Sequence, residues 1–219
     1  MWYNIDQVSK ISGVNKITLR SWESRYNFLV PTRSETRIRC YSEDELVCAV
    51  NAQVLLSEKI KISVIATKSF SEITNLVDSK FLDIKNDNKN IYISRIIRAA
   101  LCYDRNLFDT TFTQGFNKYG LSGFYTEIVF ASLNKIGYIW EVKSNDPKHE
   151  SFVSLLLEEK IKDITKELSD NKMSKDLWLL FVMSPYIFLN RSDSHFISLG
   201  KTPKMVSDAS KSLSDKWSF

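Results

Sequence analysis

The sequence predicts a mainly α-helical protein with an N-terminal winged helix-turn-helix, a helical bundle and a short C-terminal α/β remnant. Three observations predict this class. Only six glycines and four prolines occur in 219 residues, and no long stretch alternates apolar with polar residues, so an extensive sheet is not expected. Residues 3–41 have the pattern of two short helices around a glycine turn, followed by an arginine-rich arm. The apolar content of 43% is enough to form packed cores.

A first helix is predicted by apolar residues at three-residue spacing: Ile5, Val8 and Ile11. Asp6 is expected to cap this helix. Gly13 then supplies the permissive residue of a tight turn. Asn15 is the expected N-cap of a second helix, which we place at residues 16–26.

The second helix has two different faces. Its apolar face contains Leu19, Trp22 and Tyr26. Its other face carries basic side chains and short polar side chains. It contains Lys16, Ile17, Arg20, Ser21 and Ser24. Such a helix suits the major groove of DNA, where basic groups bind phosphates and short polar groups meet base edges.

An arginine-rich segment, TRSETRIRCY, follows Pro31 and predicts a small β-hairpin. We expect this hairpin to act as a wing that lies along the phosphate backbone, and its arginines are Arg33, Arg37 and Arg39. Ile38 and Tyr41 are expected to anchor its strands.

Three further helix starts are predicted by caps. Ser42 and Glu45 have the spacing of a capping box, in which each side chain bonds to the backbone N–H of the other residue. Ser63 and Ser71 are the expected caps of two shorter helices. The last of these is predicted to end near Lys80.

The positive charge of the chain is concentrated near its start. The net charge is +4, and residues 1–41 contain seven Lys or Arg and three Asp or Glu, a difference of +4, so the remaining residues sum to zero. A basic segment beside a neutral remainder indicates a polyanionic partner for that segment.

Several classes of protein are not expected. No run of 18 apolar residues predicts a membrane span, and the N-terminus lacks the pattern of a signal peptide. The three cysteines form no CxxC motif, which fits a cytoplasmic location. The two histidines are far apart, and the sequence contains no nucleophile motif, phosphate loop or metal-ligand spacing. We therefore expect neither an enzyme nor a metal site.

The segment TLRSWESRYNFLVPTRSETRIRCYSEDEL resembles the DNA-binding domain of the MerR family of bacterial transcription factors. The resemblance spans about residues 3–70. Its anchors are TLRSWE at residues 18–23, LVP at 29–31 and RCY at 39–41. Ser21 departs from the aromatic residue that the family has at this place.

This resemblance implies a winged helix-turn-helix domain over residues 1–80. It also implies a double-stranded promoter as partner and binding as a homodimer or higher homo-oligomer. Together, the basic face, the wing and the resemblance give these candidate DNA contacts: Lys16, Thr18, Arg20, Ser21, Arg25, Arg33, Arg37, Arg39 and Tyr41.

The second half of the chain has the pattern of a four-helix bundle over residues 91–170. The polar residues 83–90 are predicted to form a linker or an exposed turn. The first helix of the bundle has one apolar side, formed by Ile93, Ile96, Ile97 and Leu101. Asp104 is expected to cap the next helix, and further helices are predicted over 121–139 and 147–168.

This bundle resembles the helical cap of cobalamin-binding modules, as found in light-sensing, cobalamin-dependent MerR-type repressors and in methionine synthase. The repressor pattern is Trp-x9-Glu-His, and Trp140 and Glu150 match it. The resemblance implies that the Trp packs over the corrin and the Glu lies near its upper ligand. Ser151 replaces the histidine, and His149 would point about 200° away from position 151 on a helix. We therefore expect Trp140 and Glu150 to be a vestigial cofactor site.

Residues 175–219 are predicted to be a truncated Rossmann-like remnant. The apolar run 177–183 predicts a buried strand, and residues 195–213 resemble the second strand unit of a cobalamin-binding fold. The segment between them lacks the Asp-x-His-x-x-Gly motif whose histidine binds cobalt in that fold, and His195 cannot be matched to it. No cofactor is therefore expected, with bound cobalamin as the alternative.

The sequence thus favours a sequence-specific, double-stranded DNA-binding transcriptional regulator. Two alternatives stay open. One is a cobalamin-responsive repressor, sensing light or a ligand, that retains its cofactor. The other is a truncated interaction partner that modulates a full-length homologue, which the apolar run 177–183 suggests.

Overall fold

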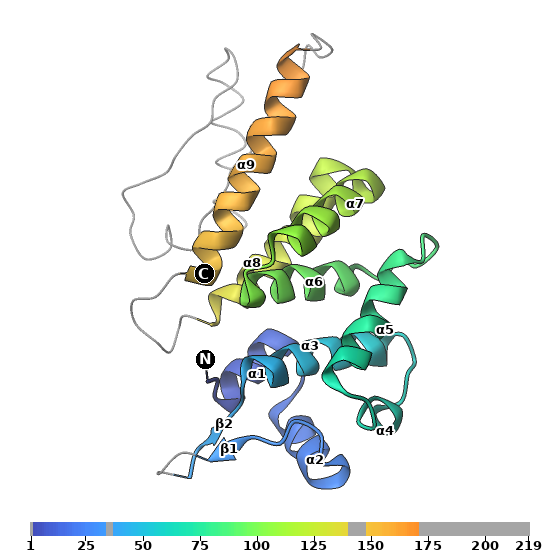
Figure 1. Cartoon of the computed structure of the whole chain (residues 1–219), viewed down its shortest axis with the longest axis vertical. Coiled ribbons are helices and arrows are strands. Elements are labelled where there is room, and N and C mark those ends of the chain that lie inside the picture. Colours follow the sequence, from blue (N-terminus) through green and yellow to red (C-terminus); the bar gives the residue numbers. More distant parts are fainter. Residues whose placement is uncertain (1, 34–36, 140–147, 171–219) are drawn as a thin grey trace, which may run out of the picture. The chain divides into compact units, whose positions relative to one another are not determined.

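The computed structural model describes residues 2–33, 37–139 and 148–170, and it is mainly helical, as predicted (Figure 1). The chain divides into two units, Met1–Val153 and Ser154–Phe219. The predicted remnant at 175–219 lies outside the described residues. In the described part of the chain, no helix combines the length and apolar character needed to cross a membrane.

Helix α1 (Ile5–Ser12) begins with a capping box that differs from the prediction. The N-cap is Asn4, whose side chain accepts a hydrogen bond from the Gln7 N–H, while the Gln7 side chain accepts one from the Asn4 N–H. The prediction of Asp6 as the cap is therefore wrong, because Asp6 already lies inside the first turn of the helix. Gly13 ends the helix with a φ of 78°, the left-handed conformation that favours glycine.

Helix α2 (Lys16–Tyr26) has the predicted bounds and the predicted N-cap. The Asn15 side chain accepts a hydrogen bond of 2.8 Å from the Ile17 N–H. The apolar face is buried at Leu19 and Trp22. Tyr26 is 37% exposed, so its expected burial is wrong, because it is the last residue of the helix before the chain turns away.

The predicted β-hairpin is present as two short antiparallel strands, β1 (Thr32–Arg33) and β2 (Arg39–Cys40). Thr32 pairs with Cys40 and Arg33 with Arg39. Tyr41 then forms an isolated bridge with Tyr3, and its side chain is buried, as expected of an anchor. Ile38 is 57% exposed and does not anchor the hairpin, so this expectation is wrong.

Helix α3 (Glu43–Ser57) starts with the predicted capping box of Ser42 and Glu45. Two further helices follow, α4 (Ile62–Ile65) and α5 (Phe70–Leu82). Their N-caps are Lys61 and Ser69.

The predicted caps of these two helices, Ser63 and Ser71, are therefore wrong by two residues. At α5 the reason is a third capping box, because the Ser69 hydroxyl accepts from the Glu72 N–H and the Glu72 carboxylate accepts from the Ser69 N–H. Because these bonds pull the helix start back, Ser71 lies inside the first turn.

The second half contains α6 (Lys89–Cys102), α7 (Arg105–Phe124), the π-helical turn η1 (Tyr125–Val129), α8 (Phe130–Gly137) and α9 (Lys148–Asp170). Asp104 caps α7 as predicted. A break at Gly120, where φ is 69°, is followed by helical residues as far as Gly137, close to the predicted 121–139. The division into a DNA-binding domain at 1–80 and a bundle at 91–170 stays a prediction.

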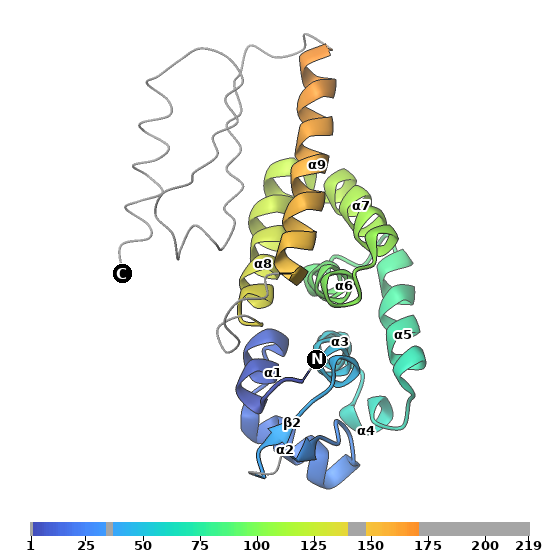
Figure 2. The same ribbon diagram turned by 60° about the vertical axis from the view of Figure 1, so that its left-hand side comes forward.

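Helix α6 is the central helix of the first unit, and it packs against α3, α5, α7 and α8 (Figures 1 and 2). All residues from Ile91 to Leu101 are buried, although three of them are polar: Ser94, Arg95 and Arg98. A helix that is buried on every side is held mainly by packing rather than by its own helix propensity.

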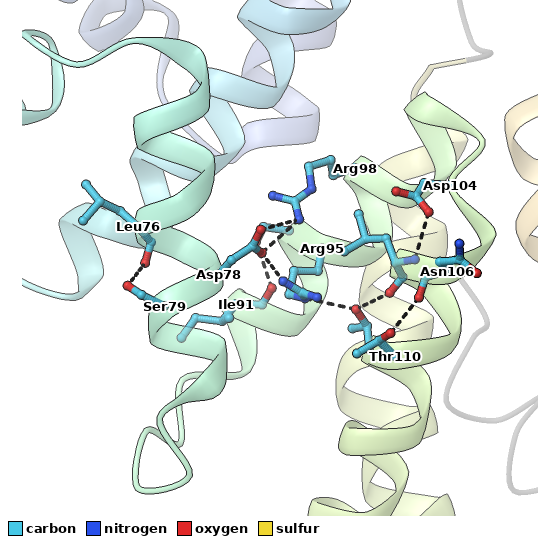
Figure 3. A network of polar contacts seen from close by, with 12 residues as sticks. Leu76, Asp78, Ser79, Ile91, Arg95, Arg98, Asp104, Asn106 and Thr110 are labelled. Carbon is cyan, nitrogen blue, oxygen red and sulfur yellow. Dashed lines mark hydrogen bonds and ion pairs between the residues drawn. The ribbon is translucent and has the colours of Figure 1, made fainter.

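The two buried arginines of α6 share one carboxylate of α5 (Figure 3). The Arg98 Nη2 donates to both carboxylate oxygens of Asp78 at 2.9 Å, and Arg95 also binds Asp78. The Arg95 Nε donates to the Thr111 hydroxyl of α7 at 3.1 Å, and its guanidinium lies 3.7 Å from the ring centroid of Phe81. Burial lowers the pKa of Arg95, and the attraction of Asp78 opposes that change.

Helix α8 and the residues just after it contact α1 through two hydrogen bonds. The Lys135 Nζ donates to the carbonyl oxygen of Ile11, and the Gln7 Nε2 donates to the carbonyl oxygen of Ile139 at 3.2 Å. These bonds join the helix-turn-helix to the second half of the first unit.

Candidate DNA-binding surface

The recognition helix α2 is anchored by its apolar face and leaves its basic face open. Leu19 and Trp22 are buried, and the Trp22 ring packs 5.8 Å from the ring of Phe28. The candidate contacts Thr18 and Arg20 are exposed, while Ser21 is only partly exposed. The buried residues therefore fix which side of the helix faces outward.

Lys16, at the start of α2, forms an ion pair with Asp6 of α1. Both side chains are about half exposed, at 49% and 56%, so water screens this pair. Asp6 thus has a different role from the predicted one, because it joins the two helices instead of capping the first.

Arg39 of the wing is bound to the recognition helix. Its Nε donates to the Glu23 Oε2 at 2.8 Å, and both side chains are partly buried. The hydrogen bond to Glu23 raises the pKa of Arg39, so the guanidinium stays charged. We therefore assign Arg39 a positioning role, since it holds β2 beside α2 (Figure 1).

The contact of Glu23 with Arg39 is a feature that the sequence did not reveal. Glu23 is part of the segment TLRSWE, but no local spacing links position 23 to position 39. Only the fold brings the wing and the helix together, so the sequence carries no direct signal for this pair.

Four candidate arginines have their side chains exposed. Arg20 and Arg25 lie on α2, and Arg33 and Arg37 lie at the two ends of the wing loop. Within the described parts of the chain, none of the four is paired with a carboxylate. Arg37 has a φ of 58°, a left-handed conformation uncommon for a side-chain-bearing residue, at the turn of the hairpin. Among the described side chains, these four charges are therefore exposed to solvent.

Tyr41 differs from the other candidates because its side chain is only 1% exposed. Its hydroxyl is buried and has no hydrogen-bond partner in the described structure, and burial raises its pKa. A contact between Tyr41 and DNA stays a prediction, and in this conformation the ring packs inside the domain.

The predicted vestigial cofactor site is only partly described. Trp140 lies outside the described residues, and Glu150 belongs to the first turn of α9. His149 is buried, its Nδ1 lies 3.0 Å from the carbonyl oxygen of Ala100, and its ring stacks on Tyr103. The expectation that His149 does not replace the missing histidine stays a prediction.

The cysteines do not form a metal site with the described side chains around them. Cys40, Cys48 and Cys102 are free thiols, and burial raises the pKa of Cys48 to about 12. Among the residues that the structure describes, no group of three His, Cys, Asp or Glu side chains is placed to hold a metal ion.

A capped two-helix unit, a glycine turn and a wing tied to the second helix define a winged helix-turn-helix domain. Within it, residues 3–68 match the family of MerR HTH regulatory proteins, as the resemblance implied. The match supports a DNA-binding transcriptional regulator of this family. No curated protein matches the chain.

Proposed function

We propose that this chain is a transcriptional regulator that binds a specific double-stranded promoter sequence. The observation that carries this proposal is the exposed basic surface made by α2 and the wing, held in one arrangement by the Arg39–Glu23 ion pair. The match to the MerR helix-turn-helix family supports it independently.

In the proposed complex, α2 enters the major groove and the wing follows the phosphate backbone. Arg20, Arg25, Arg33 and Arg37 contact phosphates, and each contact displaces a counterion from the DNA. Recognition helices contact base edges with residues at their N-terminal end. The exposed Thr18 lies at that end of α2 and is placed to meet base edges.

The chain is proposed to act as a homodimer on a palindromic site. Two recognition helices then meet successive major grooves about 34 Å apart. Analytical ultracentrifugation of the protein with a duplex of known length measures how many chains bind.

The function is tested by titrating labelled promoter duplexes at two salt concentrations. We expect binding that weakens steeply as salt increases. Because a homodimer carries two copies of each arginine, the magnitude of the slope of log K against log salt should fall by about 1.8 for Arg20→Ala, and by a similar amount for Arg37→Ala. Lys85→Ala is the matched control, because Lys85 is an exposed cation outside α2 and the wing. Absent or salt-independent binding would overturn the proposal.

A cobalamin-dependent switch is not part of the proposal. The described residues add no observation in its favour, so the expected lack of cofactor stays a prediction. Mixing the protein with adenosylcobalamin, desalting it and recording its visible spectrum tests this. A coloured protein would restore the cobalamin-responsive alternative. The role as a partner of a full-length homologue depends on residues 177–183, which lie outside the described residues.

A further inference from the structure

Ile17 is a large apolar side chain that the fold leaves in solvent. It is 75% exposed, although it lies in the second position of a well-formed helix. At about 100° per residue, it points roughly 170° away from the midpoint between Leu19 and Trp22. Ile17 therefore lies at the centre of the outward face of α2 and contributes nothing to the core.

The backbone at Ile17 is held in place. The Asn15 side chain accepts the hydrogen bond from the Ile17 N–H at 2.8 Å, which fixes the first turn of the helix. Because isoleucine is branched at Cβ, its side chain has few conformations in a helix. A fixed backbone and a stiff side chain give a defined apolar contact point.

The surroundings of Ile17 indicate which partner it meets. Lys16 and Arg20 both lie to one side of Ile17 on the helix surface, at about 100° and 60° from it, and both are exposed. Charged residues are depleted at the centre of protein–protein contacts, so this face does not suit an apolar protein partner. A polyanion with a single apolar group fits better. The major groove of DNA offers such a group, because thymine alone presents a C5-methyl there.

We propose that Ile17 contacts the C5-methyl group of a thymine, so that the preferred duplex has a thymine facing the first turn of α2. This inference rests on the proposed function and adds a specificity-determining residue to it. Arg20 would set the position of the helix on the phosphates, and Ile17 would select the base pair that faces the first turn of α2.

The experiment removes the methyl group from the DNA and the side chain from the protein. Duplexes are first selected from a random library with the wild-type protein. Each thymine of the selected site is then replaced singly by deoxyuridine, which lacks only the C5-methyl. We expect one thymine per half-site at which this change weakens wild-type binding about fourfold, the effect of one buried methylene-sized group. Ile17→Ala should lose this response.

Ile84→Ala is the matched control, since Ile84 is 89% exposed and lies outside α2. It should keep the wild-type response to deoxyuridine, as should Ile17→Val, which retains the branched side chain. The circular dichroism and melting temperature of Ile17→Ala should equal those of the wild type.

Two failures are distinguishable. If a sequence is selected but no thymine responds to loss of its methyl, or Ile17→Ala responds as the wild type does, the inference on Ile17 is overturned. The first of these results needs only the wild-type protein, so it does not depend on how the variant folds. If no sequence is selected at all, the proposed function itself is overturned.

Discussion

The Nζ of Lys135 lies 2.8 Å from the carbonyl oxygen of Ile11, so a lysine of α8 binds the C-terminal turn of α1. A cation at this end of a helix is favourable, because the last carbonyl groups carry partial negative charge. Burial lowers the pKa of Lys135. The contact joins two residues that are 124 positions apart in the chain.

Lys135→Met should destabilise the protein by about 1–2 kcal/mol. The variant keeps an apolar chain of similar length but leaves the Ile11 carbonyl without its charged donor. Urea unfolding followed by circular dichroism measures this change. Lys85→Met, at an exposed site, is the control and should be neutral within about 0.5 kcal/mol. Equal effects of the two substitutions would show that the contact does not contribute.

Asp78→Ala should be more damaging, at about 3 kcal/mol. It leaves the buried guanidinium groups of Arg95 and Arg98 without their shared carboxylate, and breaking one side of a buried ion pair is strongly destabilising. This value lies at the lower end of the destabilisation expected for breaking a buried ion pair, because Asp78 is itself 32% exposed. Thermal and urea unfolding both measure it. Asp163→Ala, on the exposed side of α9, should leave stability unchanged.

Glu23→Ala should weaken DNA binding although it removes a negative charge from the DNA-binding surface. The carboxylate holds Arg39 and therefore the wing beside α2, so its loss is expected to reduce affinity about fivefold. Titration of the selected duplex measures this effect. Glu23→Gln, which can still accept the bond from Arg39, should lose less. Tighter binding by Glu23→Ala would mean that charge alone governs this position.

The free energy of unfolding should fall at alkaline pH because Cys48 loses its proton there. Its pKa is raised to about 12 by burial, with Asp44 and Glu45 as further causes, from an ordinary value of 9.0. The folded state therefore holds the proton more tightly than the unfolded state. The resulting stability is fully present below pH 9 and is lost as pH rises towards 12.

Cys48→Ala should accordingly flatten the fall of unfolding free energy with pH above 9, by up to about 1.4 kcal/mol per pH unit. Unfolding at a series of pH values measures the two slopes. Cys40, a free thiol of the wing, provides the control variant, Cys40→Ala. Identical slopes for the wild type and Cys48→Ala would contradict this prediction.

Local signals in the sequence predicted much of the fold correctly. Asn15 and the pair Ser42 and Glu45 were identified as caps because a cap depends on residues only two or three positions apart. The predicted cap was wrong where another residue two positions earlier could also cap the helix. Asn4 is the cap in place of Asp6, and Ser69 is the cap in place of Ser71.

Contacts between distant segments could not be predicted. Arg95 and Arg98 are charged, and a charged residue on a helix normally marks a solvent-exposed face. Their burial depends on Asp78, which α5 brings alongside α6. The Arg39–Glu23 pair could not be predicted for the same reason, because the hairpin and the helix become neighbours only in the folded chain.

The burial of α6 against both α3 and α7 has a consequence for how this protein folds. Apolar residues of α3 in the DNA-binding part and of α6 in the second half belong to a continuous interior within residues 1–153. Heat or denaturant should therefore melt the helix-turn-helix and helices α6–α8 together, in one cooperative transition. A fragment cut at residue 80 would uncover the side of α3 that α6 covers, and it should tend to aggregate. The proposed recognition of DNA by α2 would thus depend on the integrity of a helix more than 60 residues further along the chain.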